Sequence, residues 1–271
     1  MLSEDILKSF NVNGEIIPLK GGQNTSVRVN NAVLKPVEGV LHSEQLFTII
    51  DSINPQGYRL SKPIKSNKGT FVTEGWGCAT FERGREVYGQ IKEKLHVARL
   101  FHHDLANIKY KYFSQVDNPW SKAHRIAWQE NELSEEIHTE ARKIIKNLLE
   151  KVQLKERYKL QIVHSDLAGN ILFDDVLPPL IIDFSPTVAP VEYAEAIIVC
   201  DCIAWQGSKI SEIDLLPDNK EMFIRAVVFR LVVGAIFSGE NFNRFIDEYY
   251  LFKQILDYIE SDSYSTKGCN S

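Results

Sequence analysis

The sequence contains little that would support a disulfide-linked or metal-stabilised scaffold. Among its 271 residues there are four cysteines and no Cys-x-x-Cys pair. That set is too small and too irregular for a disulfide framework or a thiolate metal centre. Cys200 and Cys202 lie in an apolar, helix-like stretch, where residues two apart point in different directions. We therefore expect the cysteines to be buried free thiols.

A basic surplus and a long hydrophobic run are also absent. The 31 lysines and arginines face 36 acidic residues, giving a net charge of −5, whereas nucleic-acid binders carry basic residues that neutralise phosphates. No run approaches the roughly 18 uncharged apolar residues that span a bilayer. The residues Met1–Asp5 lack the basic-then-apolar pattern of a signal peptide. We expect a cytoplasmic protein, a monomer or weak homodimer, with neither a nucleic-acid nor a membrane partner.

The composition is that of a globular protein. Hydrophobic residues make up 44% and charged residues 25% of the chain, close to the average, and a chain this long buries a core without covalent cross-links. Over residues 1–75, short apolar runs alternate with turns, and Asn30-Asn31 suits a two-residue hairpin turn. Periodic apolar residues indicate one helix near 46–53. This part is predicted to be a small antiparallel sheet with one helix.

The segment Glu74-Gly75-Trp76-Gly77 interrupts this pattern and suits a connector between two lobes. Beyond it, apolar residues recur at spacings of three and four, which is typical of amphipathic helices. The helices expected there span residues 91–108, 137–152, 192–205, 221–237 and 242–259. The sequence therefore predicts an α+β fold of two lobes: a small antiparallel β lobe with one helix over residues 1–75, and a larger, mostly helical lobe over 76–271.

Polar side chains stand at the ends of three short apolar runs between the predicted helices. Asp166 and Asn170 lie between the runs 160–163 and 171–173, and Asp183 directly follows the run 180–182. Buried strands do not tolerate such groups unpaired, and adjacent strand ends can bring them to one point. Oxygen ligands of this kind suit Mg²⁺. Asp166 is then left to accept a proton from a hydroxyl group or to orient it.

A second polar group is expected in the β lobe. A turn precedes the strand that begins near Ser26, and it contains Gly21, Gly22, Asn24, Thr25 and Ser26. Glycines there would let backbone N–H groups approach phosphate oxygens. Lys35 lies in an otherwise apolar strand and needs a counter-charge. A nucleotide phosphate or Glu44 could supply it.

Together these motifs resemble the aminoglycoside phosphotransferase-type small-molecule kinases, which have a protein-kinase-like fold. The motifs, in order, are the Gly-rich turn, Lys35, the connector, His164-Ser165-Asp166-Leu167 with Asn170, and Asp183-Phe184. The resemblance covers about residues 15–205, and its most specific part is 163–184.

The resemblance implies an enzyme that moves the γ-phosphate of ATP, or of GTP, to a hydroxyl group of an unidentified antibiotic or metabolite. Asp166 would be the catalytic base, with His164 beside it, and Asn170 and Asp183 would bind Mg²⁺. The nucleotide would contact Gly21, Gly22, Asn24, Thr25, Ser26, Lys35, Glu44 and the backbone of Glu74, Gly75 and Trp76.

The chain departs from the family pattern at several positions. Asn170 follows Asp166 by four residues, where the kinase pattern has five, and Ser165 stands where these phosphotransferases usually have glycine. No Ala-Pro-Glu motif follows Asp183, which argues against protein-kinase activity. The short spacing leaves open a nucleotide-binding pseudokinase with a regulatory role. A metal-dependent hydrolase using Asp166 and Asp183 is a third alternative, but it leaves Lys35 unexplained.

Three histidines fall within the predicted helix 91–108. His96 and His103 are seven residues apart, so they could lie on one helix face and bind a metal ion there. His102 directly precedes His103. No carboxylate completes a set of ligands. We therefore expect solvated or helix-capping histidines.

Overall fold

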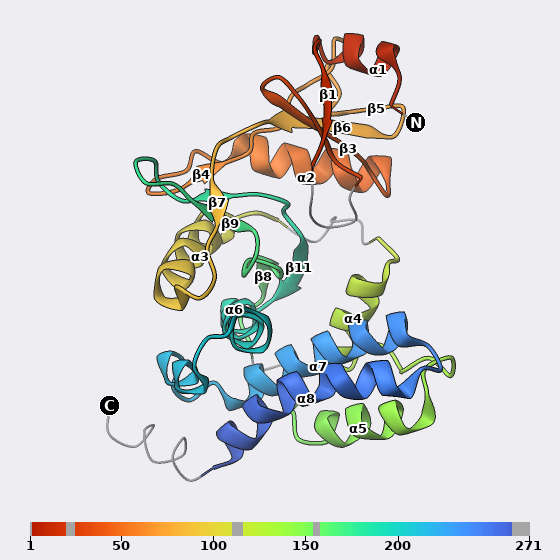
Figure 1. Ribbon diagram of the computed structural model, residues 1–271, viewed down its shortest axis with the longest axis vertical. Coiled ribbons are helices and arrows are strands. Elements are labelled where there is room, and N and C mark those ends of the chain that lie inside the picture. Colours follow the sequence, from red (N-terminus) through yellow and green to blue (C-terminus); the bar gives the residue numbers. More distant parts are fainter. Residues whose placement is uncertain (1, 20–24, 110–115, 154–157, 262–271) are drawn as a thin grey trace. The chain divides into compact units, whose positions relative to one another are not determined.

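The computed structural model describes residues 2–19, 25–109, 116–153 and 158–261 (Figure 1). Contacts divide the chain into two compact units. Unit 1 comprises Met1–Glu86, Asn107–Val116 and Asn170–Phe184, and unit 2 comprises Val87–Ala106, Asp117–Gly169 and Ser185–Ser271. The α+β class is confirmed, with a small antiparallel sheet in unit 1 and a larger helical part in unit 2.

The main sheet of unit 1 is antiparallel throughout. Its order is β1-β2-β3-β6-β5. The strands are β1 (Ile16–Pro18), β2 (Val27–Val29), β3 (Ala32–Pro36), β5 (Val72–Thr73) and β6 (Trp76–Thr80). Val29 pairs with Ala32 across the turn, and Asn30 has the left-handed φ of 51° that asparagine tolerates. The predicted Asn-Asn hairpin is confirmed.

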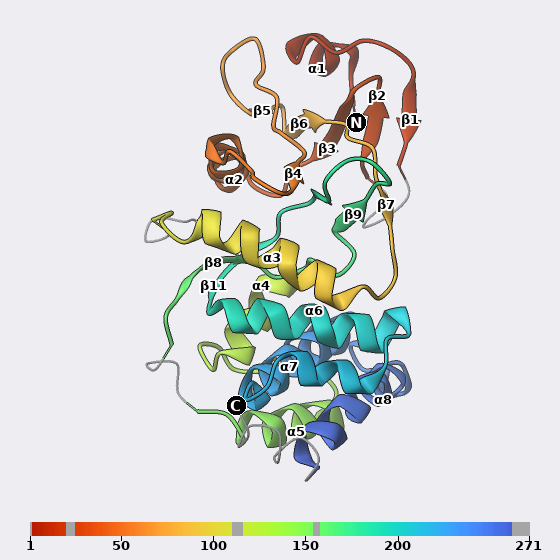
Figure 2. The same cartoon turned by 90° about the vertical axis from the view of Figure 1, so that its left-hand side faces the viewer.

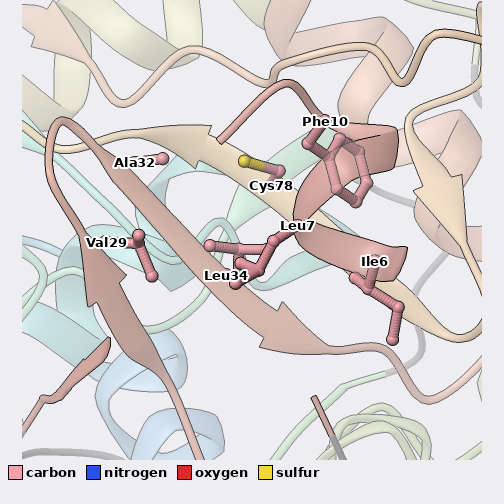
Figure 3. Close-up of a cluster of buried hydrophobic side chains, with 7 residues drawn as sticks. All are labelled: Ile6, Leu7, Phe10, Val29, Ala32, Leu34 and Cys78. Atoms are coloured by element: carbon pink, nitrogen blue, oxygen red, sulfur yellow. The ribbon is translucent and has the colours of Figure 1, made fainter. Parts of the chain in front are cut away.

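Two helices, α1 (Glu4–Ser9) and α2 (Val40–Ser52), pack on opposite faces of this sheet. Successive residues of a strand point to opposite faces, so Cys78 packs with α1 while Gly77 lies against Phe47 of α2, 2.6 Å from where a Cβ would stand. Figure 3 shows the apolar side chains on the α1 face. Helix α1 was not predicted. Its start is marked by Ser3, whose side chain accepts a hydrogen bond from the N–H of Ile6.

A second sheet in unit 1 joins segments that are far apart in the sequence. Its order is β4-β10-β9-β7. The strands are β4 (Arg59–Leu60), β7 (Arg85–Glu86), β9 (Ile171–Phe173) and β10 (Leu180–Ile181). Strand β10 is antiparallel to β9 and parallel to β4. The predicted strands 171–173 and 180–182 therefore belong to unit 1, although the sequence placed them in the helical lobe.

The predicted connector at Glu74–Trp76 is a hairpin turn inside the main sheet. Glu74 and Gly75 have left-handed φ angles of 49° and 77°, and Thr73 pairs with Trp76 on either side of them. Two left-handed residues form the tight turn that joins antiparallel strands. The chain therefore continues within unit 1 as far as Glu86, eleven residues past the lobe boundary expected at 75.

Unit 2 is built around two helices, α6 and α7, in which most residues are buried. Its helices are α3 (Ile91–Leu105), α4 (Pro119–Ala127), α5 (Thr139–Leu149), α6 (Val191–Gln206), α7 (Lys220–Ser238) and α8 (Phe242–Glu260), with the short 3₁₀ helix η2 (Ile210–Leu215). In Figure 2, α6 lies between α3 and α7. Strands β8 (Gln161–His164) and β11 (Pro186–Ala189) form an antiparallel pair, and β8 packs against α3 and α6.

The predictions for α3, α5, α6, α7 and α8 are confirmed to within a few residues at each end. Helix α4 was not predicted. It is nine residues long and begins at a capping box formed by Asn118 and Ser121. Within the described ranges, no helix is long and apolar enough to cross a membrane.

The α1 face of the main sheet offers a test of this packing. Leu34 is fully buried there among Ile6, Leu7 and Phe10 (Figure 3). We expect Leu34→Ala to lower the free energy of unfolding by about 2–5 kcal/mol, because it removes apolar contact and leaves a cavity. Urea denaturation would measure this. Leu41→Ala, at an exposed position of α2, should change the free energy by less than about 0.5 kcal/mol. Equal effects of the two substitutions would contradict this packing.

Candidate functional site

Lys35 and Asp183 form an ion pair within unit 1, although they lie 148 residues apart in the sequence. Lys35 stands opposite Gly77 in the β3–β6 ladder, so its side chain leaves the sheet on the face opposite the α1 cluster. The two side chains are 40% and 52% exposed. A pair this exposed contributes at most about 1 kcal/mol to stability. Lys35 can therefore exchange this carboxylate for another anion at little cost.

Asn170 and Asp183 lie at the same end of the β9–β10 pair. Ile171 pairs with Ile181, and the N–H of Ile182 donates a hydrogen bond of 3.0 Å to the carbonyl of Asn170. Asp183 then turns with a left-handed φ of 50°, a conformation in which aspartate is over-represented. The predicted proximity of these two strand ends is thereby found, and it follows from antiparallel pairing.

The chemistry of these two side chains fits Mg²⁺. An amide oxygen and a carboxylate are hard donors, and Mg²⁺ at phosphate sites takes one or two protein carboxylates and completes its shell with water and phosphate oxygens. Asp183 is half exposed, which leaves room for such a shell. In the described parts of the chain, no group of three or more His, Cys, Asp or Glu residues could hold a metal ion.

Glu44 is not the counter-charge of Lys35. Its carboxylate on α2 accepts a hydrogen bond of 2.7 Å from the N–H of Val72 and so joins the helix to strand β5. The structure provides a counter-charge that was not considered for Lys35, the carboxylate of Asp183. Glu44 remains a predicted nucleotide-binding residue with a structural bond of its own.

Of the other predicted nucleotide contacts, Thr25, Ser26 and Glu74–Trp76 lie in or beside the main sheet. Gly21, Gly22 and Asn24 fall outside the described residues. Thr25 and Ser26 directly precede β2, and the carbonyl of Ser26 accepts a hydrogen bond of 3.0 Å from the N–H of Leu19.

The backbone of Glu74–Trp76 is engaged in the sheet. The carbonyl of Gly75 accepts a hydrogen bond of 2.9 Å from the N–H of Val37, and Trp76 pairs with Pro36 on one side and Thr73 on the other. This pairing does not favour the predicted adenine contact there.

In unit 2, Asp166 stands just beyond β8, and His164 shapes the loop that carries it. The ring Nδ1 of His164 accepts a hydrogen bond of 3.2 Å from the backbone N–H of Asp166. The side chain of His164 is fully buried. Its predicted catalytic role is better described as positioning the Asp166 backbone.

His102 supports this loop from α3, and it is not solvated as expected. Its Nε2 accepts a hydrogen bond of 3.0 Å from the backbone N–H of His164. Burial lowers the pKa of His102 to about 3, and the neighbouring His164 adds to the shift. The ring is therefore neutral, as an Nε2 acceptor must be.

Ser165, at the position where the phosphotransferases that the motifs resemble usually have glycine, anchors the same loop. Its hydroxyl donates a hydrogen bond of 3.0 Å to the carbonyl of Ser185, so in its 2.9 Å contact with His124 the imidazole Nε2 is the donor. His124 Nδ1 then accepts from the hydroxyl of Tyr193 at 3.0 Å. Burial lowers the pKa of His124 well below 6.5, and the positive charge of Arg230 lowers it further.

Arg230 holds the side chain of Asp166, and Asp201 in turn anchors Arg230; neither residue was predicted for the site. Arg230 of α7 donates from Nη2 to Oδ1 of Asp166 at 2.7 Å, and from Nε to Oδ1 of Asp201 at 2.8 Å. Burial alone would lower the pKa of Arg230, but the two carboxylates raise it above the ordinary value. The signal was present in the sequence, because charges inside apolar helices are rarely buried unless paired.

Solved structures resemble this chain over nearly its whole length. Spectinomycin phosphotransferase APH(9)-Ia, in its AMP-bound complex, is 14% identical, with a TM-score of 0.56 over 99% of this chain and 97% of that one. Choline kinase LicA from Streptococcus pneumoniae is 11% identical, with a TM-score of 0.61 over 94% and 97%. Amicoumacin kinase hAmiN, in complex with AMP-PNP, Ca²⁺ and Ami, is 13% identical, with a TM-score of 0.53 over 94% and 93%.

These likenesses show a shared fold. The chain has the protein-kinase-like fold of aminoglycoside phosphotransferases and choline kinases, as the sequence motifs implied. No protein-family model matches the chain, and no curated protein matches its sequence.

The buried His102 predicts a specific pH dependence of stability. Its pKa falls from 6.5 to about 3 on folding, so below pH 6.5 the unfolded chain binds a proton that the folded chain excludes, and stability is lost as the pH falls. His102→Gln keeps an acceptor for the His164 N–H but does not titrate. When the pH falls from 6 to 5, we expect the free energy of unfolding of wild type to drop by about 1 kcal/mol more than that of His102→Gln.

Urea denaturation at several pH values would measure this difference. His103→Gln is the matched control, because the neighbouring His103 side chain is 89% exposed. Its stability should run parallel to that of wild type across the same range. A parallel curve for His102→Gln would contradict the account of His102 as a buried neutral acceptor.

Proposed function

We propose that this protein is a phosphotransferase that moves the γ-phosphate of ATP or GTP, with Mg²⁺, to a hydroxyl group of a small molecule. The observation that carries the proposal is the ion pair between Lys35 and Asp183, with Asn170 on the adjoining strand. A cation and two oxygen donors that share one end of unit 1 have the chemistry needed to hold a metal–nucleotide complex.

On the nucleotide side, Lys35 would exchange part of its contact with Asp183 for phosphate oxygens. Asn170 and Asp183 would supply the protein oxygens that bind Mg²⁺. The bound metal ion would neutralise charge on the phosphates and hold them in line for transfer. Little covalent chemistry is asked of the chain, because positioning and charge neutralisation supply most of the rate enhancement in this reaction class.

On the acceptor side, Asp166 would accept a hydrogen bond from the attacking hydroxyl group and take up its proton. Three residues separate Asp166 from Asn170, so the chain keeps their Cα atoms within about 14 Å of each other. The hydrogen bonds of the loop to His164 and to Ser185 fix the backbone on which Asp166 stands.

The structural neighbours support the same reaction class. They include a spectinomycin phosphotransferase, a choline kinase and an amicoumacin kinase, the last bound to AMP-PNP and Ca²⁺. Their acceptors differ from one another, so the acceptor of this chain is a separate question. The second candidate, a nucleotide-binding pseudokinase, is favoured by the Asp166–Asn170 spacing, one residue shorter than the kinase pattern.

The nucleotide side is tested by the affinity for Mg·ATP and Mg·GTP, measured by isothermal titration calorimetry. We expect Lys35→Met to weaken binding by about 10- to 100-fold, because a charge-assisted bond to phosphate contributes about 1.5–3 kcal/mol. Lys65→Met is the matched control, since Lys65 is a half-exposed lysine of unit 1 paired with Asp51, and it should leave the affinity unchanged. Equal affinities for wild type and Lys35→Met would remove Lys35 from the nucleotide site.

The acceptor side is tested by turnover. Wild-type protein is incubated with Mg·ATP or Mg·GTP, first alone and then with a panel of alcohols that includes spectinomycin and choline. We expect Asp166→Asn to lower the rate by at least about 10²-fold, the usual contribution of a positioned base, while nucleotide affinity stays within a factor of three. Nucleotide binding without hydrolysis or transfer, and with no effect of Asp166→Asn, would favour the pseudokinase.

A further inference from the structure

The geometry points to Arg230 as a positioning residue that orients the carboxylate of Asp166, with Asp201 as the anchor of Arg230. This inference rests on the proposed function, because it gives Asp166 a defined orientation towards an acceptor. It assigns a role in that function to Asp201 on α6 and Arg230 on α7, neither of which belongs to a sequence motif named above.

Asp201 fixes the guanidinium group of Arg230. The Nε of Arg230 donates to Oδ1 of Asp201 at 2.8 Å, and its Nη2 donates to Oδ2. Two bonds to one carboxylate hold the planar guanidinium in a single orientation. Nη2 also donates to Oδ1 of Asp166 at 2.7 Å, so the direction of this last bond is set by Asp201.

The surroundings of Arg230 restrict it further. Its guanidinium carbon lies 4.7 Å from the ring centroid of Phe229 and 5.2 Å from that of Trp205. Arg230 and Asp201 are 5% and 2% exposed, whereas the side chain of Asp166 is 45% exposed. The network therefore joins a buried ion pair to a carboxylate that is open to solvent.

Stability alone gives no reason for this arrangement. Taking two charges out of water has a cost that their attraction often fails to recover, and replacing such a pair with apolar residues is often neutral or stabilising. Orientation of a reacting group does depend on it, because misplacing a reacting group by about 1 Å lowers the rate by about 10²-fold. The backbone of Asp166 is held by His164, and Arg230 holds its side chain.

Helix α7 contains a second buried arginine, Arg225, that serves as a matched control for Arg230. Arg225 is also fully buried and also binds a carboxylate, that of Glu221. Its other bonds go to the backbone carbonyls of Ala127 and Gln153, and it stacks on Trp128 with 4.2 Å to the ring centroid. Arg225 thus holds unit 2 together without contacting Asp166 in the bonds described. Its substitution reports the cost of losing a buried arginine.

The experiment compares four variants with wild type: Arg230→Lys, Arg230→Met, Arg225→Lys and the double variant Arg230→Met/Asp201→Leu. Thermal unfolding is measured first, and then kcat and KM for Mg·ATP, expressed per folded protein, in the turnover assay described above. We expect Arg230→Lys to lower kcat by about 10²-fold with KM changed less than threefold, because lysine lacks the planar fork. Arg225→Lys should lower the melting temperature but leave kcat within threefold of wild type.

The double variant separates positioning from stability. Removing both charges should recover much of the melting temperature that Arg230→Met alone loses, while kcat stays about 10²-fold low. In an Asp166→Asn background, Arg230→Lys should have no further effect on kcat, since the two residues would act as one.

Three results would overturn the inference. If Arg230→Lys keeps kcat within threefold of wild type, Arg230 does not position Asp166, and the proposed function stands. If the double variant regains kcat together with its melting temperature, the role of Arg230 is structural. If wild-type protein shows no turnover with either nucleotide, the proposed function fails, and this inference fails with it.

Discussion

The ion pair of Lys35 and Asp183 depends on both sheets of unit 1. Lys35 is placed by the β3–β6 ladder, and Asp183 follows β10, which pairs with β9 and with the early strand β4. The non-local pairing of β10 with β4 joins the segment that ends in Asp183 to the early part of the chain that carries Lys35. Because the pair is half exposed, it adds little to stability and keeps a cation and a carboxylate accessible. The nucleotide side of the proposed site follows from this arrangement.

In unit 2, a set of hydrogen bonds positions Asp166 on its loop. His102 and His164 hold the backbone before Asp166, and Ser165 ties the loop to Ser185 and His124. The contacts with His102 and His124 are buried, the other two are partly buried, and burial keeps the imidazoles of His102 and His124 neutral. The loop is therefore held by several side chains, and Asp166 is its half-exposed end. Ser165, which departs from the usual glycine, supplies two of these contacts.

Features with a local signal could be predicted from the sequence. Apolar periodicity indicated α5 to α8, and the short apolar runs next to Asn170 and Asp183 indicated that the two residues would lie at adjacent strand ends. Features that depend on distant partners could not be predicted. Glu74-Gly75 suits a connector as well as a hairpin turn, and only its pairing within the sheet decides between them. The charge of Arg230 inside an apolar helix indicated a buried partner, but the identity of that partner, Asp166, and the burial of His102 arise from helix packing, which residue spacing does not reveal.

The most direct test of the central claim is a crystal structure of the protein grown with Mg²⁺ and a non-hydrolysable ATP analogue. The account predicts phosphate oxygens within hydrogen-bond distance of Lys35 Nζ, and a metal ion bound by the side-chain oxygens of Asn170 and Asp183. A nucleotide bound elsewhere, or a phosphate chain that leaves Lys35 paired only with Asp183, would contradict it.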